Sequence, residues 1–289
     1  MNTELFTKEK RWLIPSFNYI RELKKERKDR STNGDLLKAR DLAFRTQSVS
    51  LGCSPLHYKF FCLWQLNLLY ARNCSIIYKG LENIPQGCPS IFVMKHRGFA
   101  DITLHGFGYA WATSGLPYDN NPFKSNDAMR EVIDKGKSTR FLMKEDLLSL
   151  PIGHHLVLNG GIPILQDHET KALNNPGYDV NAEKVQKKIK EMSTWFSFKN
   201  SYREILNLLK ANESIMIYGE ATRVPGNKMG HLSTKFLNRL SKVKNTSFIP
   251  VGSTWNKNEK TIAYGKACQI DELRDSIASL SNLTKNDYI

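Results

Sequence analysis

The sequence predicts an α/β protein in which a central, mostly parallel sheet is flanked by helices. Short apolar runs of about five residues, the length of buried strands, alternate along the chain with longer segments of helical periodicity. Strands and helices that alternate in this way form parallel sheets covered on both faces. With 289 residues, 40% of them hydrophobic, the chain can bury a sizeable core, and we expect one domain overall.

Residues 1–72 are expected to form a basic helical region that packs on the core or on a membrane. Residues 8–30 carry nine Lys or Arg and four Asp or Glu, interleaved with apolar residues such as Trp12, Phe17 and Tyr19. Such a segment fits a solvated helical face. It also fits the headgroup region of a bilayer, where cations and aromatic rings lie side by side. The sequence leaves both interpretations open.

Two further helices are expected over residues 35–50 and 55–72, after a turn-forming stretch at 31–34. The second of these helices is strongly apolar, but polar residues such as Lys59 and Gln65 interrupt it. Because a bilayer-spanning helix needs about 20 predominantly apolar residues, we expect a buried or interfacial helix instead.

Residues 73–289 are expected to form the α/β core. The expected strands are short, apolar and bounded by turn residues, and they cover residues 75–79, 90–94, 140–144, 161–165, 214–218 and 246–252. The expected helices cover residues 101–113, 145–159, 182–209 and 231–240, and polar turns cover 80–89 and 167–177. Ligands of parallel sheets bind at the carboxyl ends of the strands, so we expect functional residues there.

Polar residues suited to chemistry or binding follow three of the expected strands. They are His96 and Asp101, Gln166, and Glu220 and Arg223. A histidine and an aspartate at the start of a helix suit general-base chemistry, in which the imidazole takes a proton from a hydroxyl and the carboxylate fixes its tautomer. The alternative is that Asp101 is only the N-cap of the helix, beside a histidine without a role.

The sequence contains no G-x-S-x-G nucleophile elbow, no H-E-x-x-H motif and no Cys/His zinc spacing. Its five Cys fit reduced thiols of a cytosolic protein better than disulfides. A base without a protein nucleophile favours direct transfer to a substrate hydroxyl, and we expect no metal.

Four blocks of the chain resemble the glycerolipid acyltransferases, a family that includes the lysophosphatidic acid acyltransferases. The first block, residues 95–101, matches the family's N-H-x4-D motif except that Lys95 stands in place of Asn. The second lies within residues 143–167, MKEDLLSLPIGHHLVLNGGIPILQD. The third, YGEATR at residues 218–223, corresponds to the family's F-P-E-G-T-R, and the fourth is Ile-Pro-Val at 249–251. The blocks occur in the order that the family has.

The resemblance implies transfer of a fatty acyl group from a thioester, acyl-CoA or acyl-carrier-protein, to a hydroxyl of a lysophospholipid-like acceptor. His96 would be the general base and Asp101 its partner. The residues assigned to acceptor binding are Arg97, Gln166, Glu220, Thr222 and Arg223. Those assigned to the acyl chain or donor are Lys144, Trp195 and Phe198. No protein-bound cofactor is implied.

Two departures from the family pattern concern the acceptor. The second block ends in Gln166, where the family has an Arg that binds the acceptor phosphate, and the third has Gly219 and Ala221 in place of Pro and Gly. Loss of one of two phosphate-binding cations is expected to weaken binding by a few kcal/mol. The acceptor could therefore be a non-phosphate hydroxyl compound, such as a specialised metabolite or a glycolipid, unless Lys95 or Arg97 replaces the missing cation.

The net charge of +14 favours an anionic partner. Acyl-CoA, an acyl carrier protein and an anionic membrane surface all qualify, and we expect a cytoplasmic protein bound peripherally to the cytoplasmic face of a membrane. A nucleic-acid-binding protein is an alternative of another class, which the lack of a zinc-finger, RNP or GxxG motif disfavours. A catalytically silent membrane adaptor is a third, which the presence of both His96 and Asp101 disfavours.

Overall fold

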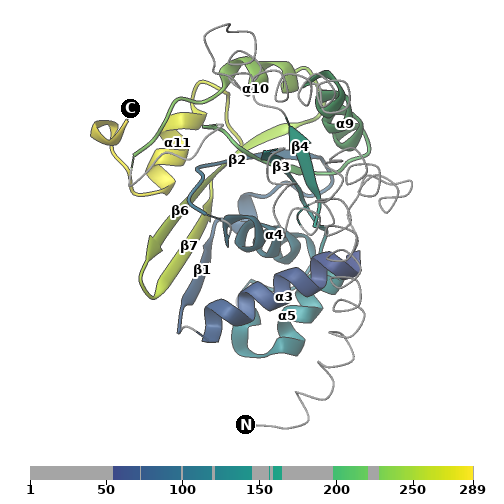
Figure 1. The fold of residues 1–289 in the computed structure, drawn as a ribbon, viewed down its shortest axis with the longest axis vertical. Helices are drawn as coiled ribbons and strands as arrows, with labels where there is room; N and C mark the ends of the chain where they lie inside the picture. Colours follow the sequence, from purple (N-terminus) through teal and green to yellow (C-terminus); the bar gives the residue numbers. More distant parts are fainter. Residues whose placement is uncertain are drawn as a thin grey trace, which may run out of the picture.

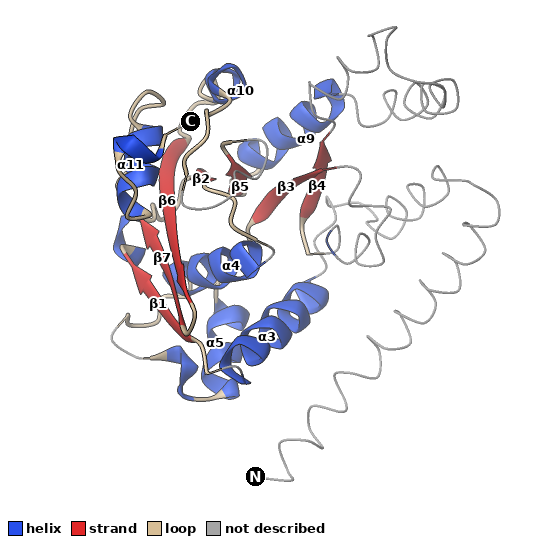
Figure 2. Ribbon diagram, turned by 60° about the vertical axis from the view of Figure 1, so that its left-hand side comes forward, coloured by secondary structure: helices blue, strands red, loops and turns tan. Residues whose placement is uncertain are grey.

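The structure of the protein is a computed structural model that describes residues 55–71, 73–98, 100–118, 121–144, 156, 159–164, 198–220 and 228–288. Within these ranges the chain forms a seven-stranded sheet with helices on both faces (Figures 1 and 2). The α/β class predicted from the sequence is therefore confirmed.

The strands are β1 (Ser75–Lys79), β2 (Ser90–Met94), β3 (Arg140–Lys144), β4 (Gly161–Ile164), β5 (Ile215–Tyr218), β6 (Ser247–Asn256) and β7 (Glu259–Tyr264). The α-helices are α3 (Pro55–Ala71), α4 (Ala100–Thr113), α5 (Asn126–Lys135), α9 (Phe198–Lys210), α10 (Thr234–Leu240) and α11 (Leu273–Leu280). Short 3-10 helices lie at Leu81–Asn83, Pro122–Lys124 and Lys285–Asp287.

The strands are ordered β1–β7–β6–β2–β5–β3–β4 across the sheet. Neighbouring strands run parallel, except for the antiparallel pair of β6 and β7. β2 lies in the middle, and Met94 at its end pairs with Tyr218 of β5 on one side and with Val251 of β6 on the other. The loops that follow β2 and β5 therefore leave the sheet side by side.

All five residues of β2 are buried because helices cover both faces of the sheet. Phe92 and Met94 belong to the core that the sheet shares with α3, α4 and α5. Ile91 and Val93 alternate with them and belong to the core on the other face, with residues of α9, α10 and α11. Figure 1 shows the two groups of helices on opposite sides of the strands.

Helix α4, which follows β2, packs closely on its neighbours because two of its residues are glycines. A Cβ atom at Gly106 would lie 2.5 Å from the hydroxyl oxygen of Tyr58 on α3, and one at Gly108 would lie 2.4 Å from that of Tyr264 on β7. The Tyr264 hydroxyl also donates to the backbone carbonyl of His105 at 3.1 Å. The position of α4 is therefore fixed from the side of α3 and from the side of the sheet.

The predicted bounds of β1, β2 and β3 are confirmed to the residue, and β4, β5, β6, α3, α4 and α10 lie within a few residues of the predicted bounds. Three elements were not predicted: α5, β7 and α11. β7 pairs antiparallel with β6, in the register Val251↔Tyr264 to Asn256↔Glu259. This pairing extends β6 to Asn256, beyond the predicted end at residue 252.

Several predicted features lie outside the described residues: the basic arm 1–30, the helix 35–50, most of 145–159, the turns 167–177 and the first part of the helix 182–209. The division of the chain after residue 72 stays a prediction, and α3 packs on the same core as α4 and α5. Among the described residues, no helix combines the length and the hydropathy needed to cross a bilayer.

Candidate active site

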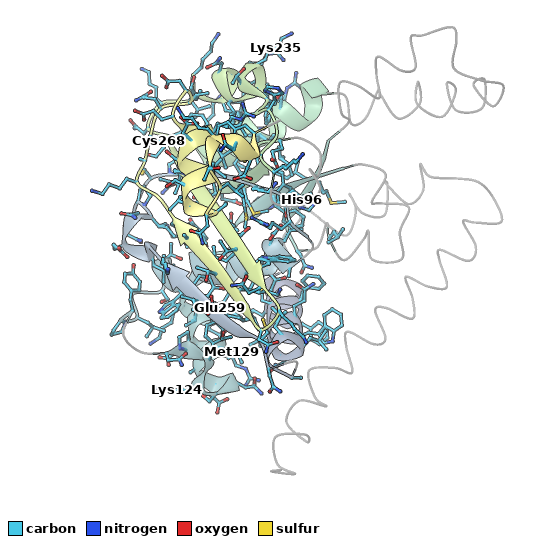
Figure 3. The ribbon with its side chains drawn as sticks, turned by 90° about the vertical axis from the view of Figure 1, so that its left-hand side faces the viewer. His96, Lys124, Met129, Lys235, Glu259 and Cys268 are labelled. Carbon is cyan, nitrogen blue, oxygen red and sulfur yellow. The ribbon has the colours of Figure 1, made fainter. Side chains whose placement is uncertain are left out.

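The candidate site lies at the carboxyl ends of β2 and β5. The Gly219 N–H donates to the carbonyl oxygen of Met94 at 3.2 Å, so the strands stay paired up to the point where their loops begin. His96 follows β2, and Glu220 follows β5. Figure 3 places His96 on one flank of the molecule, between Lys235 of α10 and Lys124 toward the opposite end.

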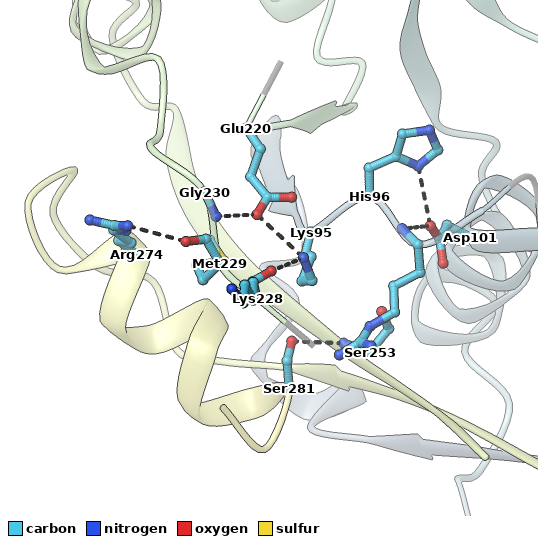
Figure 4. Close-up of polar contacts among 11 residues, drawn as sticks. Lys95, His96, Asp101, Glu220, Lys228, Met229, Gly230, Ser253, Arg274 and Ser281 are labelled. Carbon is cyan, nitrogen blue, oxygen red and sulfur yellow. Dashed lines mark hydrogen bonds and ion pairs between the residues drawn. The ribbon is translucent and has the colours of Figure 1, made fainter. Parts of the chain in front are cut away.

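His96 and Asp101 face each other between the end of β2 and the start of α4 (Figure 4). His96 Nδ1 lies 3.5 Å from Asp101 Oδ2, and the Asp101 side chain is fully buried whereas 27% of the His96 side chain is exposed. A carboxylate only accepts hydrogen bonds, so this contact favours the tautomer with the proton on Nδ1. Nε2 then carries the lone pair that can accept a proton from a substrate.

The imidazole of His96 also stacks on the ring of Tyr218, with 3.9 Å between the ring centroids and 30° between the planes. The stacking follows from the register, because Tyr218 pairs with Met94 and His96 lies two residues beyond Met94. The carboxylate at Nδ1 and the phenol ring together restrict the orientation of the imidazole.

Asp101 holds the turn that carries His96. Its Oδ2 accepts the backbone N–H groups of Arg97 at 2.7 Å and Gly98 at 2.8 Å. Hydrogen bonds to an ionised carboxylate are roughly twice as strong as neutral ones, so the turn is firmly held. The interpretation of Asp101 as the N-cap is not what the structure contains, because α4 begins at Ala100 and the carboxylate accepts from residues that precede the helix.

Lys95 points into the protein and away from His96 (Figure 4). Only 1% of the residue is exposed. Its Nζ lies 3.4 Å from Glu220 Oε1 and donates a hydrogen bond to the Lys228 carbonyl oxygen. Burial lowers the pKa of the Lys95 ammonium, and the attraction of Glu220 opposes that shift.

This geometry corrects one of the expectations from the sequence. Lys95 cannot replace the missing phosphate-binding Arg, because its ammonium is buried in an ion pair with a carboxylate of the same protein. Arg97 is half-buried. Burial lowers the pKa of its guanidinium, while the nearby carboxylates of Asp101 and Glu220 raise it. The two cations and the two carboxylates therefore form one charge cluster at the ends of β2 and β5.

Both carboxylates keep an oxygen that is not committed within the described part of the chain. Asp101 Oδ1 and Glu220 Oε2 are buried and have no hydrogen-bond partner among the described residues. Buried polar atoms are nearly always paired, so a substrate, a water or another part of the chain is expected to reach them.

The remaining predicted site residues cannot be placed in this cluster. Gln166, Trp195, Thr222 and Arg223 lie outside the described residues. Lys144 is the last residue of β3 and Phe198 the first of α9, and for both only the backbone is described. No group of three or more metal-ligating side chains occurs in the described ranges.

Two features of the site were not predicted from the sequence. Tyr218 belongs to the third sequence block, and its place at the end of a strand beside β2 would have suggested contact with the residues after β2. The backbone of residues 228–230 forms hydrogen bonds with the side chains of Lys95 and Glu220, and no sequence pattern indicates this.

No family model matches this chain, and no curated protein matches it. Solved structures do match. One of them is the 1-acyl-sn-glycerophosphate (LPA) acyltransferase PlsC from Thermotoga maritima, with 13% sequence identity and a TM-score of 0.46, over 90% of this chain and 92% of that chain.

Proposed function

We propose that the protein is an O-acyltransferase that moves a fatty acyl group from an acyl thioester, acyl-CoA or acyl-carrier-protein, to a hydroxyl of a lysophospholipid-like acceptor. The observation that carries this proposal is the contact between the partly exposed His96 and the buried carboxylate of Asp101 at the carboxyl end of a central strand. This is the arrangement that general-base catalysis needs: a basic nitrogen open to substrate and a buried anion behind the other nitrogen.

In the proposed reaction, Nε2 of His96 accepts the proton of the acceptor hydroxyl while the hydroxyl oxygen bonds to the thioester carbonyl carbon. Asp101 stabilises the imidazolium that forms and does not itself take the proton. The tetrahedral intermediate collapses, the carbon–sulfur bond breaks, and the leaving thiolate takes the proton back from the imidazolium. The protein returns to its starting state, with an ester and a free thiol as products.

For acceptor binding we propose Arg97, Gln166, Glu220, Thr222 and Arg223, and for the acyl chain or donor we propose Lys144, Trp195 and Phe198. The uncommitted Oε2 of Glu220 is suited to accept a hydrogen bond from an acceptor hydroxyl. The neutral Gln166 and the paired Lys95 support a second candidate acceptor for the same chemistry, a hydroxyl compound without phosphate, because an anion buried with too few cations is costly.

We further propose that the protein works on the cytoplasmic face of an anionic membrane. The basic residues of 8–30 support this, and so does the outer face of α3. Trp64 is 48% exposed and Leu68 42% exposed, one helical turn apart, and the Trp64 ring contacts that of Phe61 with 5.9 Å between centroids. Aromatic and apolar side chains on such a face suit the boundary between headgroups and acyl chains.

The test is to incubate the purified protein with labelled acyl-CoA or acyl-carrier-protein and a membrane lipid extract, and to identify the labelled product by mass spectrometry. His96→Ala should reduce transfer on the order of 100-fold or more without changing the melting temperature. Transfer by this variant within about threefold of wild type would remove His96 from the mechanism. If the wild-type protein binds vesicles but consumes no thioester with any acceptor, it is an adaptor and not an enzyme.

A further inference from the structure

Lys95 and Glu220 form a buried ion pair that the acyl-transfer steps do not use. The two side chains are 1% and 0% exposed, and Nζ and Oε1 lie 3.4 Å apart. Lys95 precedes the catalytic histidine directly, yet it extends to the opposite side of the chain, as successive residues in an extended segment do (Figure 4). The pair therefore joins the end of β2 to the end of β5 beneath the site.

A third segment, residues 228–230, is attached to the same pair. The Lys228 carbonyl accepts from Lys95 Nζ, and the Gly230 N–H donates to Glu220 Oε1 at 2.6 Å. Glu220 Oε1 thus accepts from two donors, Lys95 Nζ at the end of β2 and the Gly230 N–H in the segment 228–230. All of these contacts lie on one edge of residues 228–230.

The other edge of residues 228–230 is bonded to the carboxyl-terminal part of the chain. The Met229 N–H donates to the carbonyl oxygen of Asp287 at 2.8 Å, and the Met229 carbonyl accepts from Arg274 Nη2 at 3.2 Å. Met229 is completely buried. Residues 228–230 are therefore hydrogen-bonded along both edges, as an inner strand of a sheet is. The Lys95–Glu220 pair provides the hydrogen-bond partners on the edge that faces the site.

We propose that Lys95 is a positioning residue for the reaction at His96: it fixes Glu220 and residues 228–230 against the end of β2 and does not itself touch substrate. The proposal rests on the proposed function for its effect on acyl transfer. Because Glu220 precedes and Lys228 follows residues 221–227, the ammonium of Lys95 fixes the two ends of that stretch relative to the catalytic histidine.

The choice of lysine at this position has a physical reason. The side chain must extend from the end of β2 to the Lys228 carbonyl and must supply more than one donor, which an ammonium on a four-carbon chain does. Asparagine, which the resembled family has here, is shorter and uncharged. An Asn in place of Lys95 would leave the buried carboxylate of Glu220 without its cation, so the exchange is not neutral in this protein.

Amide hydrogen exchange tests whether Lys95 holds the segment, independently of any activity. In the full-length Lys95→Met variant we expect the Gly230 amide to exchange about tenfold faster or more, because its acceptor is left as an unpaired buried charge. The Gly219 amide, bonded to Met94 in the sheet, should stay within about threefold of wild type. If Lys95→Met does not fold, Lys95→Gln, which keeps a donor but no charge, is measured instead.

Steady-state kinetics test the consequence for the reaction. Lys95→Met should raise the acceptor KM about tenfold and leave the donor KM within about twofold, because acceptor-binding groups are displaced while His96 and Asp101 keep their contact. Lys135→Met is the matched control, since it removes an exposed lysine paired with Glu131 at 2.7 Å on α5. This control should change neither the KM values nor the Gly230 exchange rate.

The outcomes separate the two claims. Unchanged protection of the Gly230 amide, or an acceptor KM within about twofold of wild type, overturns the positioning role. Faster exchange at Gly230 together with a raised acceptor KM supports it. A wild-type protein that transfers no acyl group would refute the proposed function, and the exchange rates would still decide whether Lys95 holds the segment.

Discussion

His105 makes the folded protein sensitive to acid. The residue lies on α4, four positions after Asp101, and is completely buried. Its Nδ1 is 3.3 Å from the hydroxyl oxygen of Tyr264, its ring is 4.6 Å from that of Phe92 between centroids, and its Nε2 has no partner among the described residues. Burial lowers the pKa of His105 from 6.5 to about 3, because none of the described residues around it compensates the charge of an imidazolium.

The expected loss of stability follows from the two pKa values. Between pH 6.5 and about 3 the unfolded chain binds a proton at His105 and the folded chain does not, so stability is full above pH 6.5 and falls as the pH falls. Each pKa unit corresponds to about 1.4 kcal/mol. His105 alone should therefore cost about 2 kcal/mol at pH 5 relative to pH 8, and about 4 kcal/mol near pH 3.

The assay is urea unfolding of the wild-type protein and of His105→Gln at pH 8 and pH 5, followed by tryptophan fluorescence. Other groups titrate in both proteins, so the difference between their pH dependences isolates His105. The wild type should lose about 2 kcal/mol more than the variant on going to pH 5. Parallel curves for the two proteins would refute the reasoning.

Three further predictions concern the site and the membrane. Asp101→Asn should lower transfer by on the order of 100-fold or more and destabilise the fold by about 1–2 kcal/mol, since charge-assisted bonds to two backbone amides become neutral. Kinetics measure the first effect and urea unfolding the second. A mild kinetic effect would leave Asp101 with only a structural role. Deletion of residues 1–30 should weaken binding to anionic vesicles in a sedimentation assay, and binding should fall with salt; salt-independent binding that is equal in both proteins contradicts this. In a substrate screen, Gln166→Arg should improve the use of lysophosphatidic acid relative to a neutral acceptor. The inference from Gln166 is wrong if the wild type already prefers lysophosphatidic acid and the substitution leaves its affinity for that acceptor unchanged.

The strands that the sequence predicts best are those buried on both faces. β2 and β5 are continuous apolar runs, which is the sequence pattern typical of a central parallel strand buried on both faces. β7 (EKTIAY) was missed because polar residues occupy half of it and no Asn-Gly or Asp-Gly turn precedes it. α5 could have been predicted, because Met129, Val132 and Ile133 have helical spacing and the Ser125 hydroxyl caps the helix.

The pairing of His96 with Asp101 could be anticipated because the two residues are close in sequence and the turn between them is short. The contact of Lys95 could not, since its partner Glu220 lies 125 residues away. A sequence indicates that a lysine is unusual at a position, but the direction of its side chain depends on whether the backbone at the end of β2 stays extended. The fold therefore determines that the Lys95 side chain points into the protein and that the Glu220 carboxylate lies beside it.

The order of the strands has a consequence for how the chain is made. β1 pairs with β7, so that Ser75 lies opposite Glu259, and β2 pairs with β5 and β6. Among the described strands, only the pairs β3–β4 and β6–β7 join strands that are consecutive in the sequence. During synthesis, the first two strands leave the ribosome long before any partner exists for them. Among the described strands, β2 has no partner until residues 215–218 have been translated, and β1 has none until residues 259–264 have been translated. Pairing of both strands therefore depends on contacts that are distant in the sequence, which slows folding and leaves strand edges exposed for longer.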